Sequence, residues 1–166
     1  MTDETPLVRS VARLTGAAAL ALVHSAERAA MEQCLQVAVA IVGDAGQELA
    51  TYCMDGTGPQ ALGVARKKAY SAIAYRMPTD EFHEQTHERF GADGAAMITA
   101  AVEGTMLLGG GEPVVVDGYV VGAVGVSGGR GEQDRAIAGA AISEVVGSSS
   151  APAEGSSAVR AAPRLQ

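Results

Sequence analysis

The sequence contains the motif His-Glu-x-x-His at residues 83–87, read as His83-Glu84-Gln85-Thr86-His87. On a helix, residues four apart lie one turn apart on the same face, so both imidazoles can approach one Zn²⁺ or another divalent metal ion. Glu84 then lies where a carboxylate can polarise a metal-bound water. The motif makes His83 and His87 candidate metal ligands, and His83, Glu84 and His87 candidate catalytic residues.

A metal site on this motif needs a third ligand. The only other histidine is His24, so a downstream carboxylate would complete the site: Glu88, Asp93 or Glu103. Without a divalent metal, the two histidines can act as acid and base on an organic substrate, or one can ligate haem iron. A role without chemistry is also open, in which both are partly exposed polar residues beside the apolar face of Phe82 and Phe90.

A second motif, Gly125-Val126-Ser127-Gly128-Gly129, matches the G-x-S-x-G pattern of a hydrolase nucleophile elbow. In α/β-hydrolases the catalytic histidine follows the serine, whereas no histidine lies beyond His87 here. The residue order of an α/β-hydrolase therefore fails here, and the pattern lies between a predicted strand and the last predicted helix. The glycine-rich loop 128–131 precedes that helix, where an anionic group such as a propionate or a phosphate can bind.

Composition limits the class of protein. The chain has 166 residues, is 48% hydrophobic and has a formal net charge of -7, which suits one domain and argues against nucleic-acid binding. The alanine-rich stretch 14–23 is too short for a bilayer, which takes about 20 apolar residues, and the start is acidic, unlike a secretory signal. We expect a cytoplasmic protein, outside the membrane, in which Cys34 and Cys53 are reduced and mostly buried.

Periodicity and turn signals predict the elements that position these residues. Apolar residues at spacings of three and four predict helices over 6–31 (capped by Thr5), 60–76 and from residue 131 onward. Met77-Pro78-Thr79 separates off a short helix that ends near Gly91, and residues 92–108 fit either a loop or a further short helix. The last segment, 147–166, is small, polar and proline-bearing, which predicts a disordered tail.

Two pairs of branched runs predict β-hairpins. The first pairs 35–42 with 48–54, and the second spans 113–126 with Asp117-Gly118 at its turn, where both positions must tolerate positive φ. Gly122 and Gly125 indicate a bulge, a bend or a close backbone approach in the second run. Hairpins separated by helices predict an α+β domain in which helices pack on an antiparallel sheet.

Residues 109–138 read GGGEPVVVDGYVVGAVGVSGGRGEQDRAIA. This block resembles the signature of the GlcG/HbpS family of haem-binding-like proteins, which includes the C-terminal domain of PduO-type corrinoid adenosyltransferases. Met54-Asp55-Gly56 and the stretch from Arg66-Lys67-Lys68-Ala69 through Pro78-Thr79 agree with it. The resemblance spans roughly residues 8–146, so we expect a GlcG/HbpS-like domain over 1–146 before the tail at 147–166.

The resemblance implies a profilin-like α+β sandwich, with a central antiparallel sheet flanked by helices, commonly assembled into a homo-oligomer. It also implies a pocket that takes haem or a related tetrapyrrole in some members, and an architecture unlike that of metalloproteases. Lys68 matches the family's lysine, and the 109–111 loop falls near the pocket. Together with a histidine and two tyrosines able to ligate iron or orient a ligand, this makes the candidate ligand-binding residues His24, Lys68, Tyr70, Tyr75, Thr79, Gly110, Gly111 and Glu112.

We therefore expect a protein of the GlcG/HbpS type that binds a small molecule, with haem or another tetrapyrrole as the first candidate. The alternative is an enzyme on the same scaffold that acts on a small organic substrate, for example in a biosynthetic pathway, through His83, Glu84 and His87. Departures from the family pattern at Gly43 and Tyr70 motivate that alternative. A third hypothesis is an accessory protein that works through a partner.

Overall fold

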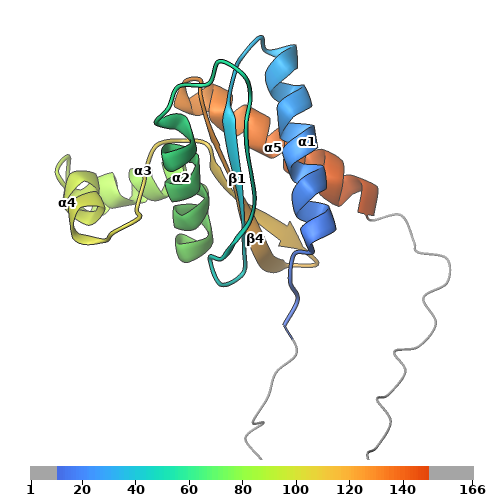
Figure 1. The fold of residues 1–166 in the computed structure, drawn as a ribbon. Coiled ribbons are helices and arrows are strands. Elements are labelled where there is room, and N and C mark those ends of the chain that lie inside the picture. The colour runs from blue at the N-terminus through green and yellow to red at the C-terminus, as the bar shows by residue number, and fades with distance from the viewer. Residues whose placement is uncertain (1–10, 150–166) are drawn as a thin grey trace, which may run out of the picture.

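A computed structural model describes residues 11–149. The four strands form one sheet in the order β2-β1-β4-β3, and every neighbouring pair is antiparallel. Helices α1 and α5 cover one face of the sheet and α2 covers the other (Figure 1). This confirms the predicted α+β sandwich. In chain order the elements are α1 (Gly16–Glu32), β1 (Ala38–Gly43), β2 (Glu48–Cys53), α2 (Ala61–Tyr75), α3 (Thr79–Phe90), α4 (Gly94–Ala101), β3 (Gly111–Val116), β4 (Tyr119–Ser127) and α5 (Gly131–Ser149).

The two faces of the sheet differ in the size of their side chains, because alternate residues of a strand face opposite sides. Larger residues such as Val39 and Ile41 are fully buried against α1 and α5. On the other face, Ala38, Ala40 and Ala123 pack against the alanine-rich side of α2. Small residues on both partners let helix and sheet approach closely, which brings the middle of α2 next to the end of β4.

Gly125 lies where this approach is tightest. A Cβ atom at this position would lie 2.0 Å from the carbonyl oxygen of Ala65 and 2.6 Å from the backbone nitrogen of Ala69. The close backbone approach that the sequence indicated is therefore the reason for the glycine. The bulge in this hairpin lies elsewhere, where the register shifts between Val114 and Val115.

Helices α3 and α4, called here the α3–α4 arm, project beside the three-layer body (Figure 1). Where the arm begins, Tyr75 stacks on Phe82 with ring centroids 3.8 Å apart. The buried Thr79 hydroxyl donates to the Leu108 carbonyl at 2.7 Å and accepts the Gly111 N–H at 3.1 Å. These contacts tie the first turn of α3 to the segment that leads into β3.

The structure corrects several boundaries. Helix α1 begins at Gly16, with the Thr15 hydroxyl accepting the Ala18 N–H at 3.1 Å, whereas the sequence predicted a start near residue 6. The expected cap, Thr5, lies outside the described residues. The ambiguous region 92–108 contains α4. Helix α5 continues to Ser149, so the first three residues of the expected tail are helical, and 150–166 lie outside the described residues.

The prediction that both cysteines are mostly buried is wrong. Cys34 and Cys53 are free, as expected, but exposed. Cys34 lies just past the end of α1 in a turn with φ of 55°, and Cys53 ends the edge strand β2. Turns after helices and the ends of edge strands face solvent whatever residue occupies them. Within residues 11–149, no helix is both long enough and apolar enough to cross a membrane.

Candidate ligand-binding site

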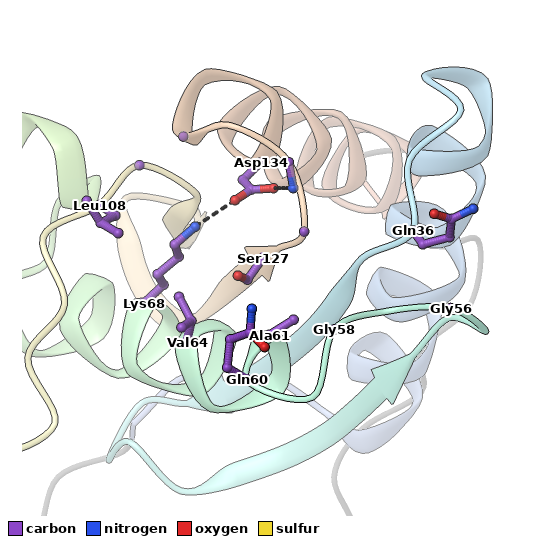
Figure 2. Close-up of a pocket in the computed structure, with 14 residues that line it drawn as sticks. Gln36, Gly56, Gly58, Gln60, Ala61, Val64, Lys68, Leu108, Ser127 and Asp134 are labelled. Atoms are coloured by element: carbon purple, nitrogen blue, oxygen red, sulfur yellow. Dashed lines mark hydrogen bonds and ion pairs between the residues drawn. The ribbon is translucent and has the colours of Figure 1, made fainter.

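A cavity of about 460 Å³, called here the glycine-rich pocket, opens where β4 passes into α5. Its walls come from the first half of α2, the loop before α2, the 108–109 segment and the glycine-rich loop 128–131. In Figure 2, Lys68 reaches from α2 toward Asp134 on α5, while Ser127 and Gln60 face the same space. The lining side chains are few, because glycines form much of the wall: Gln36, Gln60, Ala61, Val64, Lys68, Leu108, Ser127 and Asp134.

A buried ion pair forms the floor of the glycine-rich pocket. Lys68 Nζ lies 2.7 Å from Asp134 Oδ2, and their side chains are 3% and 2% exposed. The ammonium also donates to the carbonyl oxygen of Val126 at 2.9 Å, and Asp134 Oδ1 accepts the Gly129 N–H at 2.8 Å. An ammonium has three N–H donors. These contacts use two of them and leave the third without an acceptor among the described residues, while the pair as a whole is electrically neutral.

The sequence pointed to one half of this pair. Lys68 was predicted from the resemblance, but its partner Asp134 was missed. An acidic residue in the first turn of a helix is common, since it interacts well with the helix dipole, and nothing local distinguishes Asp134 from that ordinary role. Gln60 and Ser127 also line the pocket but were not among the candidate ligand-binding residues. Ser127, at the end of β4, was considered only as the serine of the G-x-S-x-G pattern, and Gln60, at the N-cap of α2, belongs to no motif.

Gly110, Gly111 and Thr79 lie behind the floor of the pocket rather than on its surface. A Cβ at Gly110 would lie 2.6 Å from Asp134 Cβ and 3.1 Å from Lys68 Nζ. Gly111 packs in the same way against the backbone of Lys68 and the methyl group of Thr79. These residues pack tightly against the side of the ion pair that faces away from the cavity.

The remaining candidate ligand-binding residues lie away from the glycine-rich pocket. His24 is exposed on α1, 3.9 Å from Glu27. Tyr70 is 44% exposed, and its ring lies beside Gly46 and Gly104. Tyr75 stacks in the root of the α3–α4 arm. The fold therefore does not gather the predicted iron-ligating side chains at one place.

Glu112, the last of the candidates, belongs to a carboxylate cluster around Arg135. The guanidinium of Arg135 lies 2.6 Å from Asp80, 3.0 Å from Glu81 and 3.2 Å from Glu112. Burial raises the pKa of Glu112 to about 7, Arg135 opposes this, and the negative charges of Asp80 and Glu81 add to it. The cluster joins the first turn of α3 to β3 and α5, so it connects the arm to the body.

Replacing Glu112 with glutamine is expected to stabilise the protein more at pH 8 than at pH 5. Because the pKa of Glu112 is raised in the folded state, the folded protein binds this proton more tightly than the unfolded chain does. The free energy of unfolding of the wild type therefore falls as the pH rises from about 4.5 to about 7, and it stays lower at higher pH. Glutamine does not ionise, so the variant avoids this loss. At pH 8 its free energy of unfolding should exceed that of the wild type by an amount on the order of 1 kcal/mol, with solvent screening taken into account. Urea unfolding at pH 5 and pH 8 measures the difference in stability, and Glu84→Gln, at an exposed position, is the control. An equal gain at the two pH values would contradict the raised pKa of Glu112.

His83 and His87 lie exposed on α3, along a shallow depression of about 500 Å³ that they share with Asp80, Glu84 and Glu88. Within residues 11–149 no group of three or more histidine, cysteine, aspartate or glutamate side chains is arranged to hold a metal ion. The helical spacing of the motif is as predicted, but a third ligand does not join it. The divalent metal site is therefore not supported, and the two histidines remain candidate acid–base residues of the enzyme hypothesis.

Comparison with known proteins identifies the family. The model of a family described as haem degrading protein HbpS-like matches residues 14–143. GlcG of Escherichia coli is 34% identical over 109 residues, covering 66% of this chain and 77% of GlcG. Klebsiella pneumoniae ORFY has a similar structure, with a TM-score of 0.77 and 28% identity over 85% of this chain and 96% of ORFY.

A solved PduOC–haem complex is also similar, with a TM-score of 0.72 and 30% identity over 80% of this chain and 94% of PduOC. The family match extends from just before α1 into α5, and so includes every strand and the whole glycine-rich pocket. The chain belongs to the HbpS-like family.

Proposed function

We propose that this protein binds a small organic ligand in the glycine-rich pocket, and that haem or a related tetrapyrrole is the first candidate. The buried Lys68, with a donor to spare at the floor of a cavity of about 460 Å³, carries the proposal. Cavities of this size are typical of small-molecule sites. The haem complex of PduOC, a relative of the same fold, supports a tetrapyrrole as the ligand to test first.

The residues that line the pocket fit the propionate groups of haem better than its iron. The propionates of a tetrapyrrole are carboxylates, which suit the Lys68 ammonium, the Gln60 amide and the Ser127 hydroxyl. Iron needs an imidazole, thiolate, thioether or phenolate ligand, and none of the residues from 11 to 149 that line the pocket supplies one. The pocket therefore fits the acidic groups of the candidate ligand and not its metal.

Filling the pocket tests the proposal. Val64 lines it from α2, and Val64→Phe adds a ring to the cavity. We expect hemin or protoporphyrin IX to bind the wild type saturably with one equivalent per chain, and Val64→Phe to weaken binding at least about tenfold, or 1.4 kcal/mol. Ala74→Phe is the matched control, because Ala74 is exposed on the same helix and outside the pocket. Unchanged affinity in a folded Val64→Phe protein would place the ligand elsewhere.

The proposal extends to assembly and location. Large apolar side chains are exposed along the α3–α4 arm and the segment that follows it: Phe90, Met97, Val102 and Leu108. Large apolar side chains exposed on a projecting arm favour an interface, so we expect a homo-oligomer, measurable by light scattering after gel filtration. The free cysteines favour a reducing compartment, in line with a cytoplasmic protein.

A further inference from the structure

We infer that the glycine-rich pocket recognises its ligand by a carboxylate and independently of any metal. The ligand is an organic acid whose carboxylate oxygen accepts the third N–H of Lys68, and if it is a tetrapyrrole, the metal-free form binds as well as the iron form. This inference rests on the proposed function, since it specifies which group of the ligand the same pocket binds.

The first observation is the chemistry of the lining side chains. They are amides, a hydroxyl, aliphatic groups and one ion pair. The Lys68 ammonium donates to Asp134 at 2.7 Å and to the Val126 carbonyl at 2.9 Å, and an ammonium has no lone pair for a metal. The histidines of the described chain are exposed on α1 and α3, and none of them lines this pocket. A ligand in the pocket therefore gains nothing from iron.

The second observation is the number of free hydrogen-bond donors and the charge at the floor of the pocket. Lys68 contributes one free donor, and its charge is already balanced by Asp134. A singly charged carboxylate adds one negative charge at a site with an ammonium donor and the positive end of α5. A doubly charged phosphate would need a second cation, and in the part of the chain that the structure describes no other lysine or arginine lines the cavity. One carboxylate is therefore the best match for this floor.

A series of three porphyrins tests the inference on the wild-type protein. Hemin has iron and both propionates, protoporphyrin IX lacks the iron, and protoporphyrin IX dimethyl ester lacks the acidic groups. We expect hemin and protoporphyrin IX to bind within about threefold of each other, and the dimethyl ester at least tenfold more weakly. Direct titration by porphyrin fluorescence gives the two metal-free affinities, and competition against protoporphyrin IX gives that of hemin.

Protein variants locate the effect. Val64→Phe should weaken protoporphyrin IX and hemin equally, whereas Ala74→Phe should weaken neither. Asp134→Asn keeps an oxygen that accepts the Gly129 N–H, and it leaves the positive charge of Lys68 unbalanced. This variant should therefore bind protoporphyrin IX more tightly, relative to the dimethyl ester, than the wild type does. A thermal melt of each variant confirms that it is folded, and the ester comparison on the wild type needs no variant at all.

The outcomes separate the inference from the proposed function. Hemin that binds tenfold or more tightly than protoporphyrin IX, with a Soret band altered by His24→Ala, His83→Ala or His87→Ala, would overturn the inference and leave tetrapyrrole binding intact. An ester that binds as well as the acid would also overturn it. If neither hemin nor protoporphyrin IX binds, the tetrapyrrole proposal fails, and the inference fails with it.

Discussion

Lys68→Met is expected to lower the free energy of unfolding by about 3–5 kcal/mol, because it leaves the Asp134 carboxylate buried without its cation. Both side chains are almost completely buried, and among the described residues the variant's Asp134 carboxylate keeps the Gly129 N–H as its hydrogen-bond partner. Equilibrium unfolding in urea, followed by circular dichroism, measures the change. A second variant, Lys68→Met with Asp134→Leu, should recover part of the loss, since removing both charges leaves no unpaired ion.

Arg66→Met provides the matched control for this prediction. Arg66 lies on the same helix and pairs with Glu48 at 2.7 Å, but both side chains are nearly half exposed. Exposed ion pairs contribute about 1 kcal/mol or less, so this variant should be close to the wild type. If the two methionine variants lost the same stability, burial of the Lys68 pair would not matter energetically, and the floor of the pocket would be less rigid than the contacts indicate.

Gly125→Ala is expected to destabilise the protein by about 3 kcal/mol, at the upper end of what overpacking usually costs. The added methyl group would meet backbone atoms of α2 rather than a side chain that can turn away. Helix α2 would have to move off the sheet, and with it the Lys68 side chain. Urea unfolding measures the loss, and weaker porphyrin binding by the folded fraction should accompany it.

Gly63→Ala separates this contact from a general effect of the substitution. Gly63 lies on α2, and a Cβ atom added there would have no neighbouring atom within 4 Å, so alanine should stabilise the helix by up to about 1 kcal/mol. The two substitutions are thus expected to have opposite signs. A Gly125→Ala protein as stable as the wild type would show that α2 can shift without loss.

Local patterns predicted most of the elements. Both hairpins were predicted, and the second one turns at Asp117 and Gly118 with φ of 50° and 79°, because the conformation of such a turn is set by its own residues. The start of α1 was misjudged for a related reason. Apolar periodicity continues N-terminal to Thr15, and only the position of the cap shows where the helix begins.

The candidate site was predicted less completely than the fold. The resemblance indicated Lys68 and the glycines around it, but the residues that could ligate iron, His24 and Tyr70, lie apart from the pocket. The spacing of His83 and His87 is a local property and was correct. Whether a third ligand joins them depends on how α3 packs, and the α3–α4 arm projects away from the body (Figure 1).

The sequence by itself determined the family, the alternation of helices and hairpins, and the glycines that close packing requires. Each of these features depends on residues that are adjacent in the sequence or recur at a regular spacing. Only the tertiary structure decided that Lys68 meets Asp134, 66 residues further along the chain, and that their neutral pair forms the floor of a cavity. Side-chain periodicity predicts which face of a helix or strand is buried, but it does not predict which residues pack against that face. The partner of a buried charge is set by the packing of α2, β4 and α5 together.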